Sequence, residues 1–212
     1  MPFASTGRRQ WLQSVVMIAG LLAGWKGAGA QTAAVQPVRE LCNALLEIMR
    51  AGHASPFAQR FSMVAPVIDR AFDLAAILQV SVGLSWSTLP ANQRDALLTA
   101  FRRYTIANYV SNFNDYDGQH FDIQPQPRSL PNGETLVQSR IIASSGSSHE
   151  LDYVMRSVGG AWKVVDVLAD GSISRVAVQR SDFRRLLSGG GASALIQSLN
   201  QKTSDLSGGA LT

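Results

Sequence analysis

The sequence has few of the residues that catalytic or metal sites need. It contains one cysteine and three histidines, and His53, His120 and His149 lie in separate segments without a spaced carboxylate or cysteine partner. This spacing argues against a zinc site. The chain also lacks a GxSxG elbow, a P-loop and a dinucleotide-binding fingerprint. We therefore expect no metal, no cofactor and no catalytic residues, and we predict that the protein is not an enzyme.

The single cysteine, Cys42, cannot form a disulfide within the chain, even in an oxidising compartment. It falls on the apolar side of a predicted helix, and no base is adjacent to it in sequence. We interpret it as a buried apolar thiol rather than as a nucleophile.

Residues 1–30 have the pattern of an export signal. Arg8-Arg9 precede an apolar run from Trp11 to Trp25, and Ala28-Gly29-Ala30 supplies the small residues that a signal peptidase accepts. A membrane anchor would need roughly 20 apolar residues, whereas this run has about 15. We predict cleavage before Gln31, and both the general secretory and the twin-arginine routes stay open.

The positive charge of the chain belongs largely to that signal. The full chain has a net charge of +4, and the first 30 residues hold three of its 19 basic side chains and none of its 15 acidic ones. The remaining chain therefore has a net charge of +1 and no large Lys/Arg cluster, which argues against a nucleic-acid partner. Residues 31–203 are long enough for a single domain, and we expect residues 204–212 to be a disordered tail.

The first half of the remaining chain is predicted to be helical and the second half to form a sheet. Apolar spacing of 3.6 residues, with cap and stop signals, predicts helices at 35–51, 57–72, 74–84 and 88–113, with Pro66 bending or dividing the second. Alternation and turn signals predict strands at 118–124, 136–142, 151–156, 162–168 and 172–178. Short helices at 182–187 and 192–199 close the chain. This order predicts an α+β architecture with helices on one face of an antiparallel sheet.

Two dipeptides predict that the last three strands form a meander. Gly159-Gly160 and Asp170-Gly171 suit two-residue hairpins, because glycine accepts a positive φ and aspartate tolerates it. Strands 151–156, 162–168 and 172–178 should therefore run antiparallel in sequence order.

The helix Arg94–Phe113 carries more apolar surface than one contact needs. Its large side chains cover about half of the circumference, whereas packing on a sheet needs a stripe somewhat over 100° wide. The surplus faces neighbouring helices, a partner or a bound apolar ligand, and the pattern alone does not choose among them.

The chain contains, in this order, the motifs Phe72-Asp73-Leu74, Val82-Gly83, Trp86, a helix with Phe101, Tyr104 and Tyr109, Tyr153, Trp162-Lys163-Val164, Asp166-Val167, Gly171-Ser172, Arg180 and Phe183. Together they resemble the MlaC family of periplasmic lipid-binding proteins, and most closely its hopanoid-associated HpnM branch. The resemblance implies a cone-like fold similar to nuclear transport factor 2, with an apolar cavity between the helices and a curved sheet. It also implies periplasmic shuttling of a hopanoid or phospholipid between inner- and outer-membrane transport complexes, among them an ABC transporter.

The resemblance further implies which side chains line the cavity. These large residues of the helices and the sheet are Phe61, Val64, Ile68, Phe72, Ile77, Trp86, Leu98, Phe101, Tyr104, Tyr109, Ile141, Tyr153, Trp162 and Val164. Strand alternation places Asp166 on the same face as Trp162, so we predict a structural Asp166–Arg180 pair that holds the closing helix over the sheet. A solvent-exposed Asp166 is the alternative.

Two other functions remain open from the sequence. The same cone houses isomerases and hydratases, which would need Asp122 or Asp152 inside the cavity near Tyr104 or Tyr109. Alternation predicts that both aspartates face outward. A scaffold that only bridges membrane complexes would instead have a filled core without a cavity.

Overall fold

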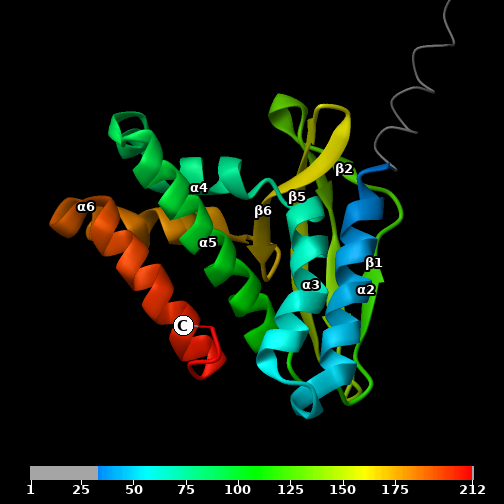
Figure 1. Cartoon of the computed structure of the whole chain (residues 1–212). Helices are drawn as coiled ribbons and strands as arrows, with labels where there is room; N and C mark the ends of the chain where they lie inside the picture. The colour runs from blue at the N-terminus through cyan, green and yellow to red at the C-terminus, as the bar shows by residue number, and fades with distance from the viewer. Residues whose placement is uncertain (1–32, 212) are drawn as a thin grey trace, which may run out of the picture.

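Five helices and one antiparallel sheet make up the part of the chain that this computed structural model describes, residues 33–211. In Figure 1, α2 and α3 lie side by side against the sheet, while α4, α5 and α6 form a second group of helices beside it. This arrangement confirms the predicted α+β architecture. The helices are α2 (Val35–Ala51), α3 (Phe57–Ala71), α4 (Leu74–Val82), α5 (Ala91–Asn112) and α6 (Arg175–Ser207), with 3₁₀ turns η1 (Gly52–Ala54), η2 (Gly83–Thr88) and η3 (Pro131–Gly133).

The described strands form a seven-stranded sheet in which all the named neighbours pair antiparallel. The order is β1-β4-β5-β3-β2, and β6 pairs with the other edge of β5 and with β7. The strands are β1 (His120–Ile123), β2 (Arg128–Ser129), β3 (Thr135–Val137), β4 (Ser139–Ile142), β5 (Ser148–Val158), β6 (Ala161–Ala169) and β7 (Ile173–Ser174).

The first two helices follow the predicted pattern. The apolar stripe of α2, including Leu41, Cys42 and Leu45, is buried. Helix α3 begins directly after Pro56 and passes through Pro66 to Ala71 as one helix. Proline removes one amide donor from the helix, but here this loss does not divide it.

A capping aspartate starts α4 and attaches it to the sheet. The Asp73 carboxylate accepts a hydrogen bond from the backbone nitrogen of Ala76 at 3.0 Å, as expected of an N-cap. The backbone nitrogen of Asp73 also donates to the oxygen of Val164 in β6 at 3.0 Å. Helix α4 ends at Val82 rather than at the predicted Leu84, because Gly83 adopts a φ of 69°.

The predicted meander is confirmed. Strand β5 pairs with β6 and β6 with β7, each antiparallel. The backbone φ is positive at both residues of both turns: 59° and 84° at Gly159-Gly160, and 50° and 70° at Asp170-Gly171. Gly159-Gly160 forms the predicted two-residue hairpin, because Val158 pairs with Ala161. The prediction of a two-residue turn at Asp170-Gly171 is wrong, because Ala169 pairs with Ile173 and the loop holds residues 170–172.

The predicted strand 136–142 is interrupted at Gln138, which separates β3 from β4. The backbone nitrogen of Ser139 donates to the Asp152 carboxylate at 3.0 Å. Asp152 pairs in β5 on the face opposite Tyr153, as alternation predicts, but it is buried, with only 4% of its surface exposed. This hydrogen bond offsets part of the cost of burying the carboxylate.

A β-bulge changes the faces of β6. The β5–β6 register shifts between Val154 and Met155, so that Val164 packs in the core against the helices and Val165 packs in a small second cluster with Leu136 and Val154. After the bulge, Val167 lies opposite Tyr153 on the face toward the helices. The extra residue breaks the strict alternation that placed Asp166 on the Trp162 face.

The end of the chain is more helical than predicted. Residues 172–178 are not one strand, because β7 ends at Ser174 and α6 begins at Arg175, where the Ser174 hydroxyl accepts from the backbone nitrogen of Ala177. Helix α6 then covers both predicted short helices, with a kink at Gly191. The predicted disordered tail starts inside this helix, which reaches Ser207 and is followed by turns.

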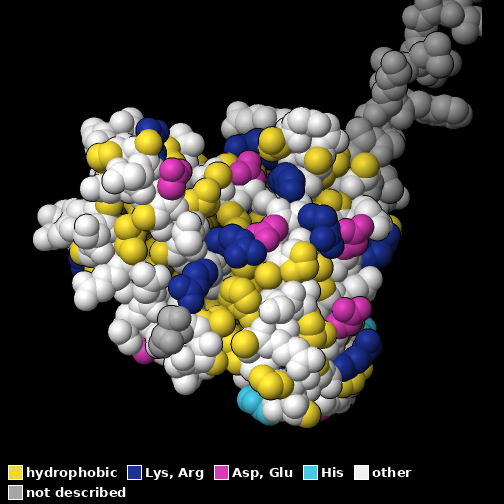
Figure 2. Space-filling model, viewed as in Figure 1, with side chains coloured by type: hydrophobic (Ala, Val, Ile, Leu, Met, Phe, Trp, Pro, Cys, Tyr) yellow, Lys and Arg dark blue, Asp and Glu magenta, His cyan; other side chains and the backbone are white. Residues whose placement is uncertain are grey.

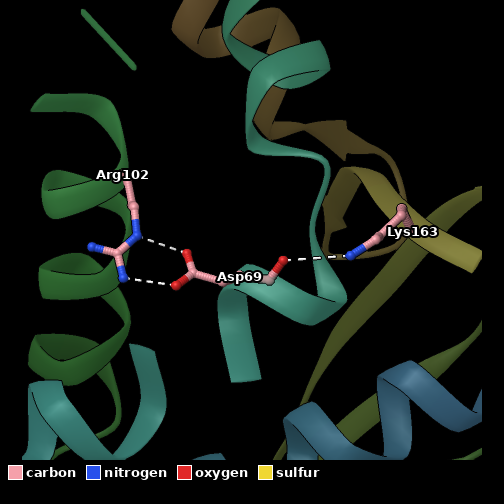
Figure 3. Close-up of polar contacts among 3 residues, drawn as sticks. All are labelled: Asp69, Arg102 and Lys163. Atoms are coloured by element: carbon pink, nitrogen blue, oxygen red, sulfur yellow. Dashed lines mark hydrogen bonds and ion pairs between the residues drawn. The ribbon is translucent and has the colours of Figure 1, made fainter. Parts of the chain in front are cut away.

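Three charged residues connect α3, α5 and β6 (Figure 3). Two guanidinium nitrogens of Arg102 each donate to the Asp69 carboxylate at 2.7 Å, and the Lys163 ammonium donates to the backbone oxygens of Asp69 and Arg70. Hydrophobic side chains are visible between α3 and α5, with Lys and Arg around them (Figure 2). Because 40% and 39% of the Arg102 and Asp69 side chains are exposed, the ion pair contributes at most about 1 kcal/mol to stability.

Candidate functional site

A cavity of about 680 Å³ lies between α5, the sheet strands β4, β5 and β6, and the start of α6. This volume is within the range of about 300–1,000 Å³ that small-molecule sites have. The described residues that line it are Met49, Phe72, Leu74, Ile77, Phe101, Tyr104, Thr105, Asn108, Tyr109, Asn112, Phe113, Asn114, Asp115, Gln119, Ile141, Ala143, Ser147, His149, Leu151, Tyr153, Asp166, Val167, Ala169, Arg175, Val176 and Gln179.

A chain of aromatic rings forms much of the apolar wall. Phe72 and Tyr109 have ring centroids 5.7 Å apart, and Tyr109 stacks on Phe113 at 5.9 Å. Phe113 also contacts Phe121 of β1, which lies outside the lining, at 6.2 Å. These separations are favourable for aromatic contacts, which hold the rings as a continuous surface from the α3–α4 junction to β1.

Two tyrosines of α5 face the cavity in a poorly solvated environment. Burial raises the pKa of the Tyr109 phenol, and it raises that of Tyr104 in the same direction. The Arg175 guanidinium opposes both shifts, so it lies close enough to act on both rings. Neither phenol is suited to lose a proton near neutral pH.

Two polar atoms in the wall are buried without a nitrogen or oxygen partner among residues 33–211. They are the Thr105 hydroxyl on α5 and the Tyr153 hydroxyl on β5. The Tyr153 hydroxyl lies beside the Cys42 thiol, a weak partner. Burial raises the pKa of this thiol from 9.0 to about 12, and the hydroxyl only partly opposes the shift. Cys42 is therefore a protonated, inert thiol, as the sequence predicts.

Half of the side chains predicted from the resemblance border this cavity. They are Phe72, Ile77, Phe101, Tyr104, Tyr109, Ile141 and Tyr153. The others pack elsewhere in the protein, either in the core (Val64, Ile68 and Val164) or partly buried against it (Phe61, Trp86, Leu98 and Trp162). A contact of any of these residues with a ligand stays a prediction.

The predicted Asp166–Arg180 ion pair does not form in the structure. The Asp166 carboxylate instead accepts hydrogen bonds from the Ser174 hydroxyl and from the backbone nitrogens of Val167 and Val176 at 2.8 and 3.1 Å. Arg180 lies farther along α6, with its guanidinium beside Gly83. Asp166 still holds the closing helix to the sheet, but it does so as a cap of α6 rather than as an ion-pair partner.

Asp122 and Asp152, the carboxylates that the sequence offered to an enzyme of this fold, lie outside the cavity, whereas Asp115 and Asp166 line it. Asp122 forms an ion pair with Arg140 at 2.7 Å, and Asp152 accepts from Ser139 on the opposite side of β5. Neither lines the cavity near Tyr104 or Tyr109. Across residues 33–211, no three His, Cys, Asp or Glu side chains lie together as possible metal ligands.

The sequence reasoning missed the polar part of the wall. Thr105, Asn108 and Asn112 line the cavity on α5, and Arg175 and Gln179 line it on α6. The signal that could have found the first set is helical spacing, because positions 105, 108 and 112 lie on the same side of α5 as Tyr104 and Tyr109. Polar residues beside an apolar stripe indicate a surface that is not fully packed.

A largely apolar cavity with few reactive groups is typical of a protein that binds a small molecule. The chain belongs to the MlaC family, because the family model described as MlaC protein matches residues 39–201. A comparison with curated proteins finds no match.

A solved structure has the same fold. It is the phospholipid-binding protein from Ralstonia solanacearum, determined in complex with a phospholipid, and it superimposes with a TM-score of 0.68. The two sequences are 22% identical, and the match covers 84% of this chain and 98% of that chain.

Within residues 33–211, the structure contains no helix of the length and apolar character that crossing a bilayer requires.

Proposed function

We propose that the protein is a periplasmic lipid carrier that takes a membrane lipid into the cavity between α5 and the sheet and delivers it elsewhere. The observation that carries the proposal is this cavity, with its wall of Phe72, Tyr109, Phe113 and Tyr153, in a chain of the MlaC family. The phospholipid in the Ralstonia protein of the same fold supports a lipid as the ligand.

The energetics of lipid transfer favour such a site. Moving hydrocarbon from water into an apolar site is favourable by about 0.8 kcal/mol per methylene, so a lipid does not cross the aqueous periplasm alone at a useful rate. Exchange between a bilayer and an apolar cavity replaces one dry environment with another. The free energy of that transfer can be close to zero, which makes loading and delivery reversible.

The periplasmic location rests on the N-terminal segment and on the family. Residues 1–30, the predicted cleaved signal, lie outside the described residues. The MlaC family is periplasmic, which supports export of this chain as well.

The cargo is a phospholipid or a hopanoid, and the partners are lipid transport complexes of the inner and outer membranes, including an ABC transporter. The hopanoid and the complexes come from the resemblance to the HpnM branch. The cone shape similar to nuclear transport factor 2 also stays part of this proposal.

We propose a carrier without enzymatic activity. The positions of Asp122 and Asp152 outside the cavity support this choice over an isomerase or hydratase that uses either of them. The presence of a cavity supports it over a scaffold with a filled core.

Native mass spectrometry of the exported protein tests the proposal. The protein should be isolated with lipid bound, and after lipid removal it should take up lipid from labelled vesicles. A protein that is isolated without lipid and takes up none from vesicles would contradict the proposal.

A further inference from the structure

Among the described residues that line the cavity, Arg175 is the sole lysine or arginine. It is the first residue of α6 and is exposed, so it lies where the cavity opens to solvent. No described carboxylate lies within ion-pair distance of its guanidinium. A cation without an ionic partner at the opening of an apolar cavity can bind an anionic group of a ligand.

Neither acidic residue of the lining forms an ion pair with Arg175. Asp166 also lines the cavity, but its oxygens accept hydrogen bonds from the Ser174 hydroxyl and from two backbone nitrogens. The other acidic lining residue, Asp115, accepts from the backbone nitrogen of Tyr116 at 2.9 Å. The lining also contains His149, on β5.

A second polar group points to the same ligand chemistry. The Thr105 hydroxyl is buried in the cavity wall and has no hydrogen-bond partner among residues 33–211. Thr105 lies on α5 between Tyr104 and Tyr109, and Arg175 acts electrostatically on both of these tyrosines. A buried hydroxyl without a partner is costly, and an acceptor on a ligand would satisfy it.

We propose that Arg175 binds the phosphate of a phospholipid head group at the opening of the cavity, that Thr105 donates a second hydrogen bond, and that the acyl chains fill the aromatic interior. The inference rests on the proposed lipid-binding function and extends it to the class of lipid. Arg175 then selects lipids that carry a phosphodiester over uncharged lipids of the same chain length. Arg175 would add no affinity for an uncharged hopanoid.

Competitive uptake tests this selection. The protein without lipid is mixed with vesicles of digalactosyldiacylglycerol, an uncharged lipid without a phosphate, that contain equal amounts of phosphatidylglycerol and of diacylglycerol with the same acyl chains. Native mass spectrometry counts each bound species. Arg175→Gln should lower phosphatidylglycerol uptake about tenfold or more, the size expected for a lost charge-assisted hydrogen bond. Diacylglycerol uptake should not fall, because its chains contact the same apolar wall and it has no phosphate for Arg175 to bind.

Arg180→Gln is the matched control, since Arg180 lies on the same helix beside Gly83 and does not line the cavity. This variant should bind both lipids like the original protein. Thr105→Val should lower phosphatidylglycerol uptake by a smaller factor, again without an effect on diacylglycerol.

The outcomes separate this inference from the proposed function. Unchanged phosphatidylglycerol uptake by Arg175→Gln, or an equal loss of both lipids, would overturn the role of Arg175. A protein that takes up neither lipid would overturn the lipid carrier itself. Inorganic phosphate alone should cause no thermal stabilisation that depends on Arg175. Such stabilisation without selective lipid uptake would mean that the site binds free phosphate instead.

Discussion

The two helical sides of the protein differ in how completely they are packed. On α3, Val64 and Ile68 are fully buried in the core. On α5, Tyr104 and Tyr109 carry the same kind of apolar spacing but border an open cavity. The difference shows that an apolar stripe identifies a buried face without saying whether protein or a ligand covers it. Substitutions at Ile68 and Tyr109 test this contrast directly.

The largest effect is expected on the packed side. Ile68→Ala removes a fully buried side chain and should lower the free energy of unfolding by about 2–5 kcal/mol. Lipid uptake should not change, because Ile68 does not line the cavity. Urea unfolding measures the first effect and vesicle uptake the second. A change in bound lipid with little loss of stability would place Ile68 in the site and remove the contrast.

Tyr109→Ala should have the opposite profile. Truncation of a packed aromatic costs about 3–5 kcal/mol, whereas a ring beside a cavity loses fewer contacts and should cost less. The amount of bound lipid should fall, because Tyr109 connects Phe72 and Phe113 in the aromatic wall. Native mass spectrometry and urea unfolding of the same sample measure both. A steep loss of stability with unchanged lipid would assign Tyr109 to the core.

The cap at the start of α6 gives a smaller effect. Asp166→Ala removes an acceptor of three hydrogen bonds and should cost about 1–2 kcal/mol. Because Arg180 does not pair with Asp166, the double variant with Arg180→Gln should equal the sum of the single effects within about 0.5 kcal/mol. A deviation from additivity well above this value in urea unfolding would indicate that Asp166 and Arg180 form the predicted ion pair.

The buried thiol of Cys42 gives a dependence on pH. Its pKa is raised from 9.0 to about 12 in the folded protein, so the folded state binds a proton more tightly than the unfolded state. Its stabilising effect is complete below pH 9 and is lost as the pH rises toward 12. Between pH 8 and 10 the loss should be about 1.4 kcal/mol. Cys42→Ala should flatten this part of the curve, and an unchanged slope would mean that the thiol is solvated.

Local signals predicted most of the fold. The stripe of α2, the Asp73 cap and the Gly159-Gly160 hairpin each depend on residues close in sequence, and the structure confirms all three. The bulge in β6 could not be predicted, because an extra residue depends on the pairing of two strands. That bulge is also why alternation gave the wrong surroundings for Asp166.

The candidate site was harder to predict than the fold. Core and cavity both contain large apolar side chains at the same spacing. The sequence therefore predicted both Val64 and Tyr109 as cavity residues. Asn108 and Arg175 were missed because a polar residue on a helix is normally read as solvent-exposed. Only the three-dimensional arrangement shows that they share a cavity with the aromatic residues.

Photo-crosslinking at two aromatic positions tests the central claim most directly. Benzoylphenylalanine is placed at Tyr109, which lines the cavity, or at Phe61, which packs partly buried against the core outside it. After loading from phospholipid vesicles and irradiation, mass spectrometry of the denatured protein detects covalent lipid. The account predicts a lipid adduct at position 109 and none at position 61. An adduct at position 61 alone, or equal yields at both positions, would contradict it.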